Sequence, residues 1–218
     1  MNSQGQAMAE TVTPFASDDV QGFLHWPEQA PVAGLVLAHG AGGDCNAPLL
    51  VATAGAFAAA GVCVLRMELP FRRLRASGPP HPAGAARDRE GLRRAAAALR
   101  ARVPGRLFMG GHSYGGRQAS MLAADEPRLA DALLLLAYPL HPPRQPGKLR
   151  TDHFPRLNTR AVFVHGTIDP FATPDELDAA VALIPAATRV IRIDRGGHDL
   201  KRGRVDLAPV VSAVLEEA

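Results

Sequence analysis

Short runs of apolar, often β-branched residues alternate along the chain with longer stretches in which apolar residues recur at helical spacing. This alternation is typical of βα units that build a mainly parallel sheet. The short runs predict strands over Val20–His25, Gly34–Ala38, Val62–Met67, Arg106–Gly110, Ala132–Tyr138, Ala161–His165 and Arg189–Ile193. The longer stretches predict helices over Pro48–Ala60, Ala85–Arg102, Tyr114–Ala124, Pro174–Leu183 and Val205–Glu217. The fold class expected is therefore α/β.

The chain of 218 residues has the length of one domain. Residues 1–12 lack the basic and apolar regions of a signal peptide, so we expect a flexible arm there and a single domain over residues 13–218. The nearly uncharged run over residues 47–65 is mostly Ala and contains Pro48, Gly55 and Gly61. It is too weakly apolar to cross a bilayer, so no membrane association is expected.

The two cysteines, Cys45 and Cys63, form no CxxC motif and have no Cys/His cluster near them in the sequence. A disulfide framework and a metal site are therefore not expected, and a reduced, cytoplasmic setting is. Residues 66–106 hold eleven of the arginines against three acidic residues. They lack interleaved aromatic residues and any nucleic-acid-binding motif, so we interpret this segment as a solvated face and expect no nucleic acid partner.

The segment Gly111-His112-Ser113-Tyr114-Gly115 follows an apolar strand and precedes a helix, which is the context of a G-x-S-x-G nucleophile elbow. A serine held at such a turn needs neighbours without Cβ atoms two residues to either side, because strand and helix approach closely there. A plain glycine-rich turn is the competing interpretation. Catalysis also requires a general base and an orienting carboxylate, in the chain order Ser, acid, His.

Both partners follow later strands. Asp169 comes after the strand over Ala161–His165, and His198 comes after the strand over Arg189–Ile193. The order, the spacing and the strand-end positions agree, so the catalytic residues predicted are Ser113, Asp169 and His198. Asp175 is instead explained as a partner of a helix dipole.

An oxyanion hole needs two backbone amides, one of them from the residue after the nucleophile, here Tyr114. The glycine-rich turn His39–Gly43 follows the strand over Gly34–Ala38, and we assign its Ala41, or alternatively Gly42, as the second donor. A phosphate-binding loop is the competing interpretation of this turn, but no G-K-[ST] follows it.

These segments resemble the α/β-hydrolase superfamily through HGAGG, GHSYGG, HGTIDPF and GGHDLK. More narrowly, GHSYGGRQASMLA and YPLHPPRQPGKLRTDHFP resemble a small, cap-less group of α/β hydrolases that is similar to dienelactone hydrolases. The resemblance implies a mainly parallel central sheet with helices on both faces, no large cap domain, a serine nucleophile and no cofactor. This chain has Ser113 where dienelactone hydrolases have a cysteine, so their lactone chemistry is not expected.

The function predicted is hydrolysis of small carboxylic esters or thioesters through an acyl-enzyme. The alternatives are an acyltransferase or perhydrolase with the same three residues, and a non-catalytic interaction module. The expected partner is a small-molecule ester or thioester. Arg72, Arg73 and His141 are candidate substrate-binding residues, since ligand sites gather where parallel strands end. Two interpretations of Arg117 are open: it forms a salt bridge inside the protein, or its side chain reaches the active site. We prefer the salt bridge.

Overall fold

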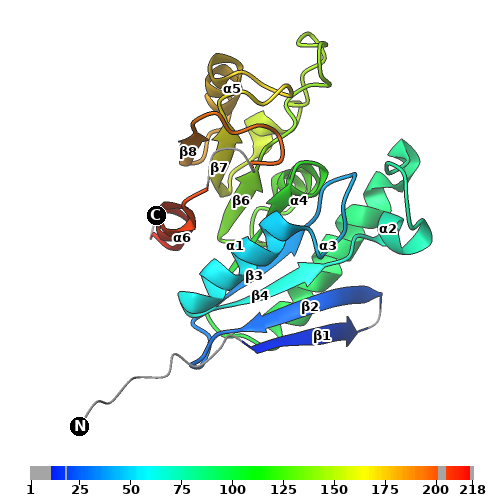
Figure 1. Cartoon of the computed structure of the whole chain (residues 1–218), viewed down its shortest axis with the longest axis vertical. Helices are drawn as coiled ribbons and strands as arrows, with labels where there is room; N and C mark the ends of the chain where they lie inside the picture. Colours follow the sequence, from blue (N-terminus) through cyan, green and yellow to red (C-terminus); the bar gives the residue numbers. More distant parts are fainter. Residues whose placement is uncertain (1–10, 18, 201–204, 217–218) are drawn as a thin grey trace.

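The structure is a computed structural model and describes residues 11–17, 19–200 and 205–216. Its centre is an eight-stranded sheet in the order β1-β2-β4-β3-β5-β6-β7-β8 (Figure 1). The strands β1 and β2 pair antiparallel, as do β2 and β4, and all the other neighbours are parallel. The bounds are β1 Thr11–Ser17, β2 Val20–Trp26, β3 Ala33–Ala38, β4 Val62–Met67, β5 Arg106–His112, β6 Ala132–Leu136, β7 Arg160–Gly166 and β8 Thr188–Ile193.

Helices cover both faces of this sheet, and the described residues add no large cap to it, as predicted. The α-helices are α1 Pro48–Ala59, α2 Pro70–Leu74, α3 Ala85–Arg100, α4 Tyr114–Asp125, α5 Pro174–Val181 and α6 Leu207–Leu215. Alternate residues of the central strands point to opposite faces. Leu35 and Leu37 of β3 belong to a buried cluster that includes residues of α1 and α6, whereas Val36 belongs to the cluster on the other face, which includes residues of α3, α4 and α5.

The predicted elements recur with small shifts of their ends. The strand predicted over Ala132–Tyr138 ends at Leu136, because Ala137 takes a φ of 48° and its N–H donates to the Val164 carbonyl at 2.8 Å. The last helix begins at Leu207, where the Asp206 side chain accepts a hydrogen bond from the N–H of Ala208. Residue 217, where this helix is predicted to end, lies outside the described residues.

Among the described strands and α-helices, β1 and α2 have no counterpart in the prediction, and neither do two 3-10 helices over Pro82–Gly84 and Phe154–Arg156. The edge strand β1 begins at Thr11, so residues 11 and 12 of the predicted arm lie in the sheet, while residues 1–10 lie outside the described residues. Only Phe15 of this strand is buried, which leaves a weak hydrophobic pattern. The five-residue helix α2 is too short to show a period. None of the helices in the described part of the chain has both the length and the apolarity needed to cross a bilayer.

Candidate active site

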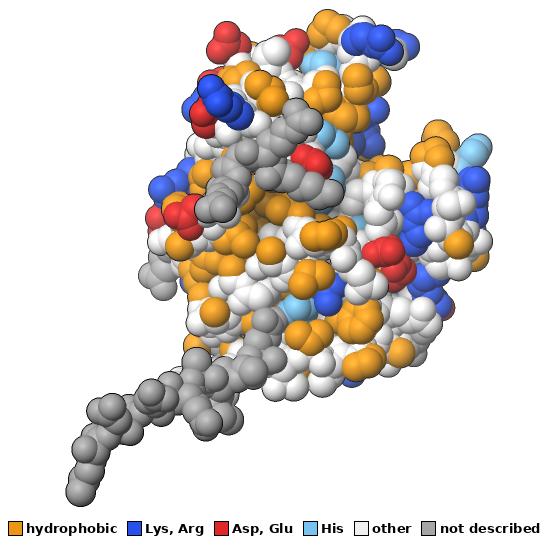
Figure 2. All heavy atoms as spheres, viewed as in Figure 1, with side chains coloured by type: hydrophobic (Ala, Val, Ile, Leu, Met, Phe, Trp, Pro, Cys, Tyr) orange, Lys and Arg blue, Asp and Glu red, His pale blue; other side chains and the backbone are white. Residues whose placement is uncertain are grey.

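The predicted catalytic residues follow β5, β7 and β8, three parallel strands on one side of the sheet. Their carboxyl ends meet at the same edge, so the three loops converge there. In the space-filling view the surface is hollowed between the part that carries α5 and the part that carries α2 (Figure 2).

Ser113 lies at a sharp turn between β5 and α4, with a φ of 50°. Its N–H donates to the Leu136 carbonyl at 2.8 Å, which fixes the turn to the neighbouring strand β6. A Cβ added to Gly111 would lie 2.1 Å from the Ala38 carbonyl oxygen, and one added to Gly115 would lie 2.6 Å from it. Both flanking glycines are therefore required by close backbone approach, as expected for a nucleophile elbow.

A continuous chain of hydrogen bonds joins the three side chains. His198 Nε2 lies 2.8 Å from Ser113 Oγ, and His198 Nδ1 lies 2.9 Å from Asp169 Oδ2. A carboxylate can only accept, so Nδ1 carries the proton and Nε2 of the neutral ring is left to accept from the serine hydroxyl. The arrangement matches that of a serine nucleophile, a general base and an orienting acid.

The environment holds this chain in place. The Asp169 residue is only 4% exposed, and its Oδ1 accepts a hydrogen bond from the Phe171 N–H at 2.8 Å. The Phe171 ring stacks on the His198 imidazole with centroids 4.0 Å apart. His198 therefore has its plane fixed by a ring on one side and its tautomer fixed by a buried carboxylate.

Two further histidines support the loops of the site. His112 Nε2 donates to the His198 carbonyl at 2.8 Å, and His165 Nε2 donates to the Ala172 carbonyl at 3.1 Å. Burial lowers the pKa of both rings, so they are neutral at pH 7. Both rings therefore brace the loops of the site through backbone carbonyls.

The glycine-rich loop after β3 faces Ser113. His39 braces it, since its Nδ1 donates to the Gly40 carbonyl at 2.8 Å and its Nε2 lies 2.6 Å from Glu68 Oε1 and 3.1 Å from the Leu69 nitrogen. Ala41 and Gly42 line one cavity together with Ser113, His198 and Tyr114, which begins α4; we call it the Ser113 cavity, and its volume is about 890 Å³. The predicted oxyanion donors therefore lie around the space in which a substrate carbonyl would sit.

The Tyr114 side chain is bound by α3. Its hydroxyl donates to Asp88 Oδ2 on α3 at 2.6 Å, and Asp88 Oδ1 accepts from the Phe71 N–H at 2.9 Å. Burial raises the pKa of Asp88, which has no exposed surface. This link fixes the first turn of α4 against α3 and leaves the Tyr114 backbone as the part near the nucleophile.

The predicted substrate-binding residues do not line the Ser113 cavity. Arg72 donates from Nε to the Gly43 carbonyl at 2.9 Å and from Nη2 to the Ala41 carbonyl at 2.8 Å, so it holds the glycine-rich loop. His141 lies 3.3 Å from Glu176 Oε2 and is 5% exposed.

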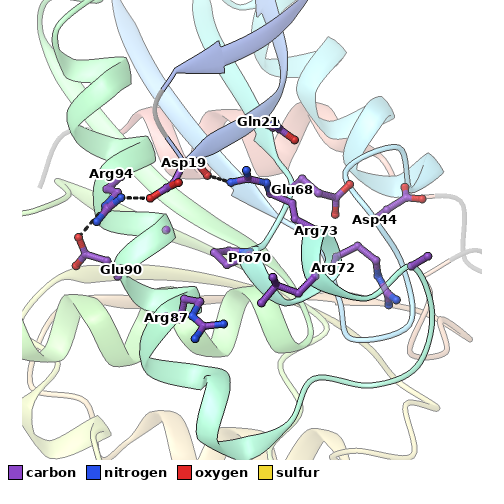
Figure 3. A pocket seen from close by; sticks show the side chains of 13 residues that line it. Asp19, Gln21, Asp44, Glu68, Pro70, Arg72, Arg73, Arg87, Glu90 and Arg94 are labelled. Atoms are coloured by element: carbon purple, nitrogen blue, oxygen red, sulfur yellow. Dashed lines mark hydrogen bonds and ion pairs between the residues drawn. The ribbon is translucent and has the colours of Figure 1, made fainter.

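Arg73 belongs to a second cavity of about 920 Å³ beside β2 and α3, which we call the edge cavity. Figure 3 shows Arg73 pointing to the backbone of Asp19, whose carbonyl accepts its hydrogen bond, while Arg94 binds the Asp19 and Glu90 carboxylates. The sequence places Arg72 and Arg73 after a strand but does not say where their side chains point, and the structure places Arg73 in the edge cavity instead of the Ser113 cavity.

Two arginines do line the Ser113 cavity, Arg117 of α4 and Arg150 of the loop after β6. The preferred reading of Arg117 as half of an internal salt bridge is wrong: within the described residues no carboxylate forms an ion pair with it. Its position four residues after Ser113 is the signal that could have placed it on the face of the site. Arg150 has no such signal, because its position depends on the conformation of a Pro-rich loop. Nor is any group of three or more His, Cys, Asp or Glu side chains in the described part of the chain placed to hold a metal ion.

The sheet, the strained turn at Ser113 and the loops that meet it define the fold class of an α/β hydrolase. A family model described as "Alpha/beta hydrolase domain" matches residues 31–208, and the chain belongs to that family.

Solved structures show the same fold. A dienelactone hydrolase from Anabaena variabilis is 21% identical with a TM-score of 0.70, covering 94% of each chain. A lid-less serine hydrolase from Xanthomonas campestris is 17% identical with a TM-score of 0.70, covering 94% of this chain and 92% of its own. Est1E from Butyrivibrio proteoclasticus, solved with ferulic acid bound, is 17% identical with a TM-score of 0.71, covering 93% of this chain and 96% of its own.

Proposed function

We propose that this chain is a serine hydrolase that cleaves small carboxylic esters or thioesters through an acyl-enzyme. The observation that carries the proposal is the unbroken chain from Ser113 Oγ through His198 to Asp169, with contacts of 2.8 and 2.9 Å. A serine hydroxyl is a weak nucleophile at neutral pH, and a hydrogen-bonded, oriented imidazole is what activates it.

In the acylation half, Ser113 Oγ attacks the substrate carbonyl carbon while its proton moves to His198 Nε2. The carbonyl electron pair moves onto oxygen, where the amides of Tyr114 and of Ala41 or Gly42 stabilise the negative charge. Asp169 stabilises the imidazolium that forms. When the carbonyl reforms, the alcohol or thiol leaves with the proton from His198.

In the deacylation half, water gives a proton to His198 and attacks the acyl-serine. The second oxyanion collapses, Ser113 Oγ regains its proton, and the carboxylic acid is released. Esters and thioesters suit this site better than amides, because their leaving groups need less assistance. An Xanthomonas serine hydrolase without a lid and a ferulic-acid-bound Est1E share the fold, which is consistent with this chemistry.

The test is the intact mass of the protein after exposure to a fluorophosphonate, for the wild type and for Ser113→Ala. We expect one adduct on the wild type, none on the variant, and release of acid from a panel of esters and thioesters by the wild type alone. A folded wild type that takes no adduct would rule out an activated serine. Added alcohol or peroxide acceptors that divert the acyl group would instead indicate an acyltransferase or perhydrolase.

A further inference from the structure

The Ser113 cavity contains two cationic side chains from different parts of the chain. Arg117 lies one helical turn after Ser113, and its N–H donates to the Ser113 carbonyl within α4 at 2.9 Å. Residues four apart on a helix share a face, with Cβ atoms about 5–6 Å apart. Arg150 reaches the same cavity from the loop after β6, where Tyr138 Oη donates to its carbonyl at 2.8 Å.

Among the residues that the structure describes, no acidic side chain neutralises either guanidinium. No carboxylate in the described ranges forms an ion pair with Arg117 or Arg150, and Arg117 Nε is buried without a hydrogen-bond partner. Arg150 Nη1 donates to the neutral Pro139 carbonyl at 3.2 Å. The pKa of Arg150 is lowered, first by burial and then by the charge of Arg117, which indicates that the two cations act on each other.

Two titratable side chains beside Arg117, those of His153 and Tyr138, are neutral. His153 donates from Nε2 to Ser120 Oγ at 2.8 Å, and burial followed by the charge of Arg117 lowers its pKa to about 4. Tyr138 faces Arg117 with a hydroxyl whose pKa burial raises. Among the described residues that line the cavity, Asp199 is the one carboxylate, and it directly follows His198 in the loop on the other side of the nucleophile.

Two neighbouring, partly buried cations that no described carboxylate pairs with favour the binding of an anion, because an unpaired charge is costly to bury. A planar carboxylate accepts hydrogen bonds from guanidinium groups in a defined geometry. We infer that Arg117 and Arg150 form a subsite for a carboxylate carried by the substrate, so that the preferred substrates are esters or thioesters with a free carboxylate on the acyl or the leaving group. This inference rests on the proposed hydrolase function.

Two pairs of probes test it. The acyl pair is the para-nitrophenyl monoester of glutaric acid and its terminal carboxamide. The leaving-group pair is the butyrate ester of para-hydroxybenzoic acid and that of para-hydroxybenzamide. Each pair differs only in a carboxylate against a neutral amide, and kcat/KM is measured for the wild type, Arg117→Gln, Arg150→Gln and Arg128→Gln. Arg128 is exposed in the turn after α4 and does not line the cavity, so it is the matched control.

We expect both cavity variants to lower kcat/KM for the carboxylate probe of at least one pair by about 10- to 100-fold, the cost of losing a charged hydrogen bond. In the same variants, kcat/KM for the neutral probes, which also reports on folding, should change by less than about threefold. Arg128→Gln should leave kcat/KM unchanged for the carboxylate probes and for the neutral probes. Arg117→Lys should retain part of the preference because it keeps the charge. Equal losses on both members of each pair, or no loss, would overturn the subsite.

A binding measurement separates this inference from the hydrolase proposal. Glutarate binding to the wild type and to Arg117→Gln is followed by calorimetry, which needs no turnover. Binding that is weakened about 10-fold or more in the variant supports the subsite even if no probe is hydrolysed. Hydrolysis that depends on Ser113, with glutarate binding absent or unchanged in the variant, retains the hydrolase and removes the carboxylate subsite.

Discussion

The edge cavity and the Ser113 cavity have almost the same volume, about 920 and 890 Å³, and both contain arginines. They differ in what the arginines bind. In the edge cavity, Arg94 pairs with Asp19 and Glu90, and Arg73 donates to the Asp19 carbonyl (Figure 3). In the Ser113 cavity, Arg117 and Arg150 have no carboxylate partner within the described residues.

Cavity size and arginine content therefore do not separate a binding site from a surface network, whereas the pairing of charges does. Figure 2 shows Lys and Arg side chains together with acidic ones around the part that carries α2. Such exposed pairs contribute little and satisfy one another. The four predictions below test this difference, beginning with the largest expected effect.

The largest effect concerns the chemistry that only the Ser113 cavity contains. Asp169→Asn should lower kcat by about 10⁴-fold, because an amide does not hold the His198 tautomer that accepts the serine proton. Initial rates with a neutral ester measure this, and circular dichroism checks the fold. The control is Asp175→Asn, an exposed first-turn residue of α5, which should retain full activity. Equal losses in both variants would contradict the assignment of the acid.

The second prediction concerns the packing behind the nucleophile. Gly115→Ala should destabilise the fold by about 2–3 kcal/mol, because the new Cβ would lie 2.6 Å from the carbonyl oxygens of both Ala38 and His39, which are backbone atoms that cannot move aside freely. Gly84→Ala, before α3, meets nothing within 4 Å and should change stability by less than about 0.5 kcal/mol. Urea unfolding measures the stability of both variants against the wild type. Equal stabilities of the two variants would refute the close packing at Gly115.

The third prediction is a pH dependence of stability due to His153, the neutral histidine beside Arg117. Its pKa is about 4 in the fold, against an ordinary value of about 6.5 in the unfolded chain. The unfolded state therefore binds the proton first, and stability should fall as the pH is lowered from about 6.5 to about 4, by about 3 kcal/mol in all.

His112 and His165, whose pKa values burial also lowers, contribute with the same sign. The measurement is therefore the difference in unfolding free energy between the wild type and His153→Gln. The glutamine does not titrate, and its amide can still donate a hydrogen bond to Ser120. Unfolding free energies across this pH range should show a shallower slope in the variant. Parallel slopes would mean that His153 does not titrate in this range.

The sequence predicts the local parts of this site well and the relations between distant side chains poorly. The elbow at Ser113 and the strand-end positions of Asp169 and His198 depend on short patterns, and the structure brings these residues together. The choice of cavity arginines depends on side-chain direction and on partners far away in the chain. Arg72 and Arg73 follow one strand, yet one binds a loop next to the site and the other binds the β1–β2 turn.

The sequence does not predict the edge strand β1, and the reason is related. It alternates weakly, contains Pro14 and buries only Phe15, so it is stabilised by pairing with β2 rather than by its own pattern. Arg150 could not be placed either, since the loop after β6 has no periodicity that would fix the direction of its side chains.

The smallest effect should come from Arg72, which lines the edge cavity and binds the glycine-rich loop of the Ser113 cavity. Its guanidinium binds the Ala41 and Gly43 carbonyls, so Arg72→Gln should loosen the loop that carries the proposed oxyanion donor. We expect kcat to fall by about 10-fold, the cost of about one charged hydrogen bond, with KM changed by less than about twofold, because loop position matters most when charge develops on the carbonyl oxygen. Neutral and carboxylate probes should lose activity equally, which distinguishes Arg72 from Arg117. Arg73→Gln, the adjacent arginine that binds Asp19, should leave kcat and KM unchanged; a loss there as large as that of Arg72→Gln would show that the edge cavity is coupled to catalysis and would end the distinction drawn between the two cavities.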